Sequence, residues 1–171
     1  MKCRNSWQSP LGEIILEADE KGLNGLWFAE GHHCANPDPD AVVLDNPAID
    51  EAKRWLEDYF AGRDPGFTPP LHLMGTDFRT RVWAALLEIP FGRTATYGQI
   101  AARVGASARA VGGAVGSNPV SLIVPCHRVV GANGSLTGYA GGLWRKEALL
   151  RLEGSLPEES EAAQPSPKEK P

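Results

Sequence analysis

Residues 96–116 read TYGQIAARVGASARAVGGAVG, and this stretch decides the fold of the second half of the chain. The spacing of its apolar residues predicts a helix from Thr96 to about Val104, which Gly105 ends. Ser107 then caps a second short helix. A helix, a glycine turn and a helix over about twenty residues form the helix-turn-helix pattern. Any two short helices joined by glycine look alike, so the pattern alone does not establish DNA binding.

The second of these helices has very little side-chain bulk. Glycine costs about 1 kcal/mol relative to alanine inside a helix, so this composition needs a reason. One reason is tight packing against a neighbouring helix. The other is close approach of its backbone to a nucleic-acid groove, with Arg109 as the one long side chain in the tract, and composition does not choose between them. The small residues are Ala108, Ala110, Gly112, Gly113, Ala114 and Gly116.

Two further helices flank this stretch. One begins at Thr76 and ends before Pro90, and the other spans 143–153. Between them, residues 119–130 are apolar and rich in β-branched side chains, which indicates a segment that passes through the core. The second half of the chain is therefore expected to be mainly helical.

The first half of the chain predicts a small sheet and one helix. Residues 13–18 and 23–28 have strand composition and flank a turn signal. A polar, proline-containing loop then reaches to Asn46, which together with Pro47 begins a helix that ends at Gly62. Strands followed by helices predict an α/β fold class.

A proline- and glycine-rich stretch, residues 63–75, is interpreted as the linker between the two halves. We therefore divide the chain into an N-terminal α/β domain (1–70), a mainly helical C-terminal domain (71–154) and a tail (155–171). The tail is dominated by Glu, Ser, Pro and Lys, so we expect it to be disordered.

The chain has 171 residues, of which 42% are hydrophobic and 22% charged, the balance of a globular protein with a sizeable core. The uncharged run 111–126 is interrupted by glycine and proline, and no stretch predicts a membrane span. The first residues lack the apolar core of a signal peptide. Three cysteines, Cys3, Cys34 and Cys126, are too few and too far apart for a disulfide framework. We expect a reduced, cytoplasmic compartment.

Charge is unevenly distributed along the chain. Residues 1–75 contain 6 Lys/Arg and 13 Asp/Glu, a net charge of −7, whereas residues 76–154 contain 9 and 4, a net charge of +5. Residues 155–171 contribute −2. Eight of the nine basic residues in the middle segment are arginines, which suit bidentate contacts with phosphates and bases. That segment is either a solvated basic face or a nucleic-acid interface.

The chemically informative motif is Pro125-Cys126-His127-Arg128. A thiol is only a few per cent thiolate at neutral pH, so a nucleophilic cysteine needs a nearby base. His127 is adjacent, but neighbouring side chains on an extended segment point in opposite directions, so contact would need a turn or a water. The alternative interpretation is an inert core thiol beside a core imidazole that bonds the backbone.

Together with its neighbours, this motif closely resembles the O6-alkylguanine-DNA alkyltransferases, or methylated-DNA–protein-cysteine methyltransferases. The resemblance covers residues 6–154, and its most specific part is Pro-Cys-His-Arg-Val with an asparagine eight residues before the cysteine. It implies a small ribonuclease-H-like N-terminal α/β domain, followed by a mainly helical, winged-helix-like domain that carries the helix-turn-helix. The other matching segments are residues 96–101, 108–114, 117–119 and 137–143.

The resemblance implies a suicide DNA-repair protein. Such a protein flips O6-alkylguanine, with O4-alkylthymine as a second candidate, out of duplex DNA and moves the alkyl group irreversibly to its own cysteine. No cofactor is needed, because the substrate carries the alkyl group. The expected partner is damaged duplex DNA; we expect a monomer with no membrane contact and no obligate protein partner.

Roles carried over from the resemblance fall on particular residues. Cys126 resembles the alkyl acceptor, His127 its base through a water, and Glu153 the carboxylate that orients the imidazole. Asn118 resembles the hinge asparagine before the cysteine. Tyr97 resembles the tyrosine that crowds the phosphate and donates a proton to the departing guanine. The reaction needs a nucleophile, a base and an acid, and these residue types supply them.

Further roles concern the DNA and the base. Arg109 resembles the finger that fills the space of the flipped base. Backbone groups of Cys126, Val129 and Ala140 would read the guanine edges, with Tyr139 lining the pocket. Where many members carry serine, this chain has Ala140, so any help from that hydroxyl is lost. The residues expected at the DNA are Arg109, Ala108, Gly112, Gly113, Tyr97 and Arg128.

Two other functions and one metal site are compatible with parts of the sequence. A pure DNA-binding module would leave Cys126 inert. A cysteine hydrolase or thiol oxidoreductase would use Cys126 and His127, but no Cys-x-x-Cys is present. We expect no metal, because the candidate ligands match no structural zinc spacing. These are Cys3, His32, His33 and Cys34.

Overall fold

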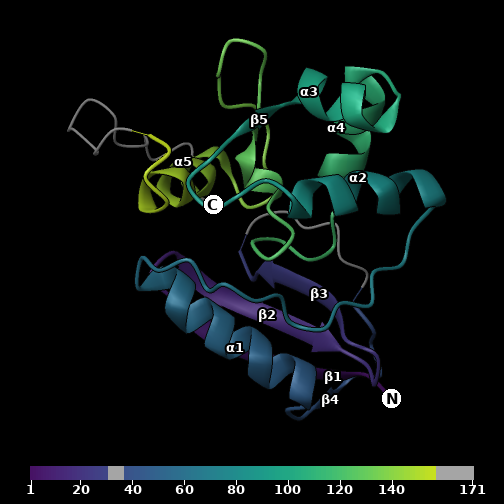
Figure 1. Ribbon diagram of the computed structural model, residues 1–171. Coiled ribbons are helices and arrows are strands. Elements are labelled where there is room, and N and C mark those ends of the chain that lie inside the picture. The colour runs from purple at the N-terminus through teal and green to yellow at the C-terminus, as the bar shows by residue number, and fades with distance from the viewer. Residues whose placement is uncertain (31–36, 157–171) are drawn as a thin grey trace.

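The computed structural model describes residues 1–30 and 37–156, which form a sheet covered by one helix and, beside it, a mainly helical part (Figure 1). The sheet has the strand order β3-β2-β1-β4. Strands β1, β2 and β3 pair antiparallel, and the short β4 pairs parallel to β1. The predicted α/β class is confirmed. The strands are β1 (Cys3–Ser9), β2 (Gly12–Ala18), β3 (Leu23–Phe28) and β4 (Val42–Val43).

Strand β1 was missed by the sequence pattern, and so was β4, which lies in the stretch expected to be a loop. Most of the β1 side chains are polar or only half-buried, so its sequence carries little strand signal. The strand is held instead by its neighbours, because β2 pairs with its whole length, from Cys3 opposite Ala18 to Ser9 opposite Gly12. Pairing, rather than local propensity, makes this strand.

Helix α1 (Pro47–Phe60) lies across one face of the sheet (Figure 1). The predicted start is confirmed: the Asn46 side chain accepts a hydrogen bond from the backbone N–H of Ile49 at 2.9 Å, and Pro47 occupies the first turn. The helix has one apolar face, which packs into the core. Its buried residues are Ala48, Ile49, Ala52, Trp55, Leu56 and Tyr59.

The helical part follows the predicted pattern closely. The side chains of Thr76, Thr96 and Ser107 each accept a backbone N–H and so cap three helices at the predicted starts. Gly105 ends α3 with a φ of +72°, a left-handed conformation that favours glycine. The elements are α2 (Asp77–Leu87), β5 (Ala95–Thr96), α3 (Tyr97–Val104), α4 (Ala108–Gly116), β6 (Val129–Val130) and α5 (Leu143–Leu152).

Residues 119–130 connect the two parts and are buried throughout, as the sequence predicted. Leu26 of β3 donates its N–H to the carbonyl of Pro119 at 3.0 Å and accepts from the N–H of Ser121 at 3.0 Å. The apolar core therefore continues from the sheet into the helical part. The segment follows α4, contacts β3 and leads directly to Cys126.

None of the helices in the described parts of the chain is both long and apolar enough to cross a membrane. The predicted disordered tail lies outside the described residues, apart from Ser155 and Leu156. The domain boundaries proposed from the sequence stay predictions.

Candidate active site

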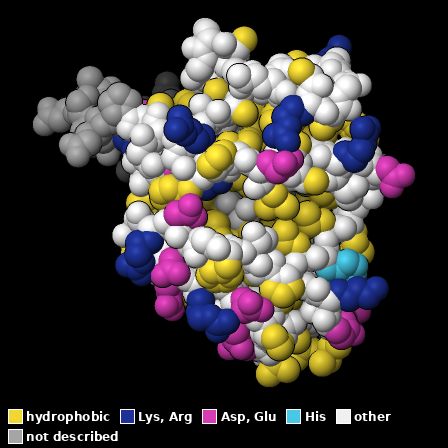
Figure 2. Space-filling view, viewed as in Figure 1, with side chains coloured by type: hydrophobic (Ala, Val, Ile, Leu, Met, Phe, Trp, Pro, Cys, Tyr) yellow, Lys and Arg dark blue, Asp and Glu magenta, His cyan; other side chains and the backbone are white. Residues whose placement is uncertain are grey.

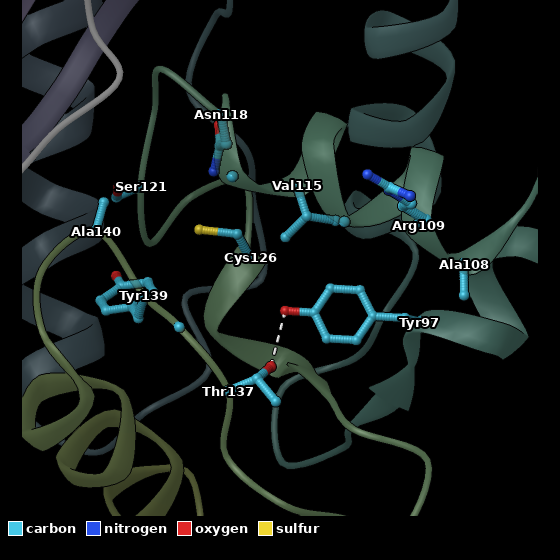
Figure 3. Close-up of a pocket in the computed structure, with 13 residues that line it drawn as sticks. Tyr97, Ala108, Arg109, Val115, Asn118, Ser121, Cys126, Thr137, Tyr139 and Ala140 are labelled. Atoms are coloured by element: carbon cyan, nitrogen blue, oxygen red, sulfur yellow. Dashed lines mark hydrogen bonds between the residues drawn. The ribbon is translucent and has the colours of Figure 1, made fainter.

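A cavity of about 690 Å³ lies between α3, α4, the turn at Cys126 and the loop 137–140 (Figure 3). This volume is typical of sites that hold a small molecule. The sulfur of Cys126, the hydroxyl of Tyr97 and the ring of Tyr139 surround the same space (Figure 3). Eight of the residues expected at the site line this cavity. They are Tyr97, Ala108, Arg109, Gly112, Asn118, Cys126, Tyr139 and Ala140.

Cys126 begins a 3₁₀ turn, Cys126–Arg128, and is 8% exposed. The segment before it is held by Asn118, whose Nδ2 donates to the carbonyl of Val124 at 2.9 Å and whose Oδ1 accepts from the N–H of Val120 at 3.0 Å. In the segment between Asn118 and Cys126, Leu122 has a φ of +70°, a strained conformation for a leucine. The two hydrogen bonds of the Asn118 amide thus stabilise the unusual backbone conformation that places the thiol at the cavity.

Behind Cys126 lies a buried imidazole–carboxylate pair. Nε2 of His127 is 2.6 Å from Oε2 of Glu153, and both side chains are fully buried. Burial alone would raise the pKa of Glu153, but hydrogen bonds and charges from His127 and Arg128 lower it to about 2. Glu153 is therefore an anion that only accepts hydrogen bonds.

The protonation state of His127 follows from this contact. Burial lowers the pKa of His127, which favours the neutral ring. Because Glu153 can only accept, the ring proton lies on Nε2, which leaves Nδ1 with a lone pair. That Nδ1 atom is buried and has no hydrogen-bond partner among the described residues. An imidazole prepared in this way can act as a base for the adjacent cysteine.

Arg128 is bonded within the protein. We expected it at the DNA, but it is 7% exposed, and its Nε donates to Oε1 of Glu153 at 2.8 Å. Its Nη1 donates to the carbonyl of Ile89 at 2.7 Å. The guanidinium neutralises the buried carboxylate and is not available to a phosphate. These contacts do not favour the expected DNA role of Arg128, which stays a prediction.

The expected reading of the guanine by backbone groups of Val129 stays a prediction. Val129 is fully buried in β6 and does not line the cavity, and its carbonyl accepts a hydrogen bond from Nζ of Lys146 at 2.7 Å. The same Nζ donates to the carbonyl of Thr137 at 3.0 Å. Burial lowers the pKa of Lys146 to about 8. The lysine ties the loop of the cavity wall to the strand after Cys126.

Sequence reasoning missed Lys146, as well as Tyr59. The available signal was the spacing of Lys146, because it lies three residues before Leu149 and so shares the apolar face of that helix. A lysine is rarely fully buried without a role. Tyr59 lies in the helix predicted between Asn46 and Gly62, where the sequence assigns it no role at the site. Its hydroxyl donates to Oε2 of Glu153 at 2.5 Å, across 94 residues of sequence. No local pattern encodes that contact.

Two tyrosines face the cavity. Oγ1 of Thr137 donates to the hydroxyl oxygen of Tyr97 at 3.0 Å, which leaves the proton of Tyr97 for another acceptor (Figure 3). Burial raises the pKa of Tyr139 well above its usual value, so that this ring stays a neutral phenol. Tyr97 can supply a proton, and Tyr139 supplies an aromatic surface.

The surface beside the cavity is formed by α4. Arg109 and Ala108 in its first turn are exposed and line the mouth. A Cβ added at Gly112 would lie 4.0 Å from the ring of Tyr97, whereas one at Gly113 would meet open space. Gly113 does not line the cavity, and its expected approach to DNA stays a prediction. On the face seen in Figure 2, basic and acidic side chains are interspersed rather than gathered into a field of one sign.

Among the described residues no group of three or more His, Cys, Asp or Glu side chains could hold a metal ion. Of the zinc candidates, His32, His33 and Cys34 lie outside the described residues.

Family models match both parts of the chain. Residues 4–73 match "6-O-methylguanine DNA methyltransferase, ribonuclease-like domain", and residues 77–155 match "6-O-methylguanine DNA methyltransferase, DNA binding domain". A methylated-DNA–protein-cysteine methyltransferase of Methanosarcina acetivorans is 50% identical over 151 residues, which cover 87% of this chain and 96% of the relative. The corresponding protein of Mycobacterium leprae is 48% identical over 153 residues, with 88% and 91% covered.

A solved structure is similar throughout. The OGT of Mycobacterium tuberculosis, crystallised in complex with DNA, superimposes with a TM-score of 0.79 at 46% sequence identity, and the match covers 89% of this chain and 92% of that one. The O6-methylguanine DNA methyltransferase of Methanococcus jannaschii matches with a TM-score of 0.63 at 29% identity, over 91% and 96% of the two chains. The two-part architecture of the described residues is thus the architecture of these proteins.

Proposed function

The chain belongs to the 6-O-methylguanine DNA methyltransferase family, and on that premise we propose that it repairs duplex DNA by moving the alkyl group of O6-alkylguanine onto the sulfur of Cys126. The reaction is stoichiometric, because the thioether that forms is stable and nothing in the scheme regenerates the thiol. Each molecule therefore acts once.

The observation that carries the proposal is the thiol of Cys126 at a cavity wall, backed by the buried pair of His127 and Glu153. His127 takes the thiol proton at Nδ1 through one water molecule. The thiolate attacks the alkyl carbon in line with the carbon–oxygen bond, so that a carbon–sulfur bond forms as that bond breaks. The bonding electrons pass to the guanine, which takes a proton from Tyr97 as it leaves.

Glu153 orients the imidazole and stabilises the imidazolium that forms. Asn118 holds the backbone that presents the thiol, and its two hydrogen bonds inside the turn support that role. Tyr139 and Ala140 form the wall against which the base would lie, and their places in the cavity lining support this. The polar groups that act on the substrate are few, and the rest of the cavity is apolar, as in most small-molecule sites.

The DNA would lie along α4. The target oxygen is inside the base stack, so the nucleotide must be flipped out at a cost of about a few kcal/mol. Arg109 at the mouth of the cavity would fill the vacated space and offset part of that cost. The small residues Ala108 and Gly112 let the duplex approach the helix closely. The DNA contact is expected to depend on shape and phosphate charge rather than sequence.

The two rival functions fit the site less well. A DNA-binding module gives no reason for a buried His127–Glu153 pair behind a thiol. A cysteine hydrolase would pass through a thioester that water cleaves, whereas the relatives of this chain are named for methyl transfer to a cysteine. Because the thiol must stay reduced to accept an alkyl group, we place the protein in the cytoplasm.

The proposal is tested with a duplex in which one O6-methylguanine blocks a restriction site. Restored cutting should rise with protein and stop at one repaired guanine per protein molecule. Cys126→Ser should bind the duplex without restoring the site, and Cys3→Ala, which changes the buried thiol of β1, should repair normally. Repeated turnover, or repair by Cys126→Ser, would overturn the proposal.

A further inference from the structure

The carboxylate behind the thiol receives a hydrogen bond from the sheet-and-helix part of the chain. Tyr59, near the end of α1, is fully buried, and its hydroxyl is 2.5 Å from Oε2 of Glu153. The same hydroxyl oxygen is 3.4 Å from Nε2 of His127. Among the described residues, Tyr59 is the one side chain from the N-terminal part that bonds this pair.

We propose that Tyr59 is a positioning residue for alkyl transfer, so that the N-terminal domain completes the site. The inference rests on the proposed function, since it assigns Tyr59 to the same reaction. Tyr59 does not touch the substrate; it acts through Glu153 and His127.

The hydroxyl of Tyr59 is one of several donors that hold the carboxylate of Glu153. Oε1 accepts from Nε of Arg128 at 2.8 Å and from the N–H of Gly92 at 3.2 Å. Oε2 accepts from Nε2 of His127 at 2.6 Å, from Tyr59 at 2.5 Å and from Nη2 of Arg128 at 3.2 Å. The carboxylate therefore cannot rotate without losing a charge-assisted hydrogen bond.

The contact also fixes the direction of the protons. Because Glu153 is an anion, the hydroxyl proton of Tyr59 must point at it, and the phenol oxygen then turns a lone pair towards Nε2 of His127. If Nε2 of His127 carried a lone pair instead of a proton, it would face the hydroxyl oxygen of Tyr59 and Oε2 of Glu153 with no proton to share with either. Tyr59 thus favours the tautomer with the proton on Nε2 and the lone pair on Nδ1, the atom that must receive the thiol proton.

The tyrosine ring is held independently of its hydroxyl. It stacks on Trp55 with the ring centroids 5.0 Å apart and meets the edges of Phe60 and Phe91 at 5.2 and 5.9 Å. A phenylalanine at position 59 keeps these contacts. Tyr59→Phe therefore removes the hydrogen bond without opening a cavity in the core.

The alternative is that Tyr59 only satisfies a buried hydroxyl and that its loss affects stability alone. The two roles differ in their effect on proton transfer. Without the hydroxyl, more of the negative charge of Glu153 acts on His127, and the pKa of His127 rises. Since the base must be neutral, the acidic limb of the pH–rate profile then moves to higher pH.

The experiment measures single-turnover methyl transfer from an O6-methylguanine duplex to the full-length protein as a function of pH. We expect Tyr59→Phe to be about 3- to 10-fold slower near neutrality, with its acidic limb raised by about half a pH unit or more. The matched control is Ser9→Ala, which removes a buried hydroxyl that donates to the carbonyl of Gly12 at 2.6 Å. Ser9 is far along the chain from His127 and Glu153. The acidic limb of this control should not move.

A Tyr59→Phe profile that superimposes on the wild type, whatever its melting temperature, would overturn the inference while leaving the proposed function intact. A wild type that transfers no methyl group would overturn the proposed function itself. If Tyr59→Phe does not fold, nitrogen-15 NMR of the wild type decides: we expect a proton on Nε2 of His127 with a nuclear Overhauser contact to the Tyr59 hydroxyl proton. A proton on Nδ1 of His127 would overturn the inference.

Discussion

Replacing Glu153 with glutamine removes the negative charge at the centre of the buried network and keeps the shape of the side chain. The side chain of Glu153 is fully buried, and the side chain of Arg128 beside it is only 8% exposed. In the variant this cation loses its carboxylate partner. The new amide NH₂ group also faces an N–H or O–H donor of His127, Tyr59 or Arg128, where the carboxylate accepted hydrogen bonds. Breaking a buried ion pair in this way is costly.

The magnitude can be taken from the pKa of Glu153. Burial raises that pKa, but the surrounding hydrogen bonds and charges lower it from the usual 4.5 to about 2. The difference corresponds to about 3 kcal/mol of stability at neutral pH, within the usual range for a broken buried pair of about 3–5 kcal/mol. We expect Glu153→Gln to lower the free energy of unfolding by about 3 kcal/mol, or the melting temperature by about 6–12 °C.

The pH dependence gives a second check. Because folding depresses the pKa of Glu153, the stabilisation is present above pH 4.5 and is lost as the pH falls towards 2. The glutamine variant has no such group, so the unfolding free energies of the two proteins should converge over this range. Well-separated curves at the acid end would contradict the linkage.

The assay is urea unfolding followed by circular dichroism at several pH values. The matched control is Glu88→Gln, because Glu88 pairs with Arg103 on the surface, where the two side chains are 63% and 48% exposed. We expect the control to lose less than about 1 kcal/mol. A Glu153→Gln variant that is no less stable than Glu88→Gln would refute the reasoning.

Three further predictions concern the reaction. Arg109→Ala should lower the repair rate more than the affinity for damaged duplex at fixed salt; equal losses would contradict its role in base flipping. Tyr97→Phe should bind normally but transfer methyl groups about 100-fold more slowly, and an unchanged rate would remove it as proton donor. Lys146→Met should slow iodoacetamide modification of Cys126, read by peptide mapping, because the positive charge of Lys146 interacts with the thiolate of Cys126 and stabilises it. Because Lys146 has a pKa of about 8, the wild-type advantage should fade at higher pH; a constant ratio would contradict the charge effect.

The parts of the fold that local signals encode were predictable. Asn46, Thr76 and Ser107 cap helices at the predicted residues, because capping depends only on the next few residues. Strand β1 was not predictable in this way, since it is stabilised by pairing with β2 and β4. The helix-turn-helix pattern became informative only in combination with the cysteine motif.

The candidate site shows the same division. Cys126 and His127 are adjacent and could be read directly from the sequence, and the family resemblance supplied Glu153. The burial of Arg128 could not be read, because it depends on a carboxylate 25 residues away. Tyr59 lies 94 residues from Glu153 in the chain. Contacts that only the folded core creates have no local sequence signal.

The most direct test of the account is mass spectrometry of the protein after incubation with a duplex that carries a single O6-methylguanine. The intact protein should gain one methyl group per molecule, on the peptide that contains Cys126, and none with undamaged duplex. The released DNA should contain ordinary guanine in its place. A protein that binds the lesion and stays unmodified, or one that carries the methyl group on another residue, would contradict the assignment of Cys126 as the acceptor.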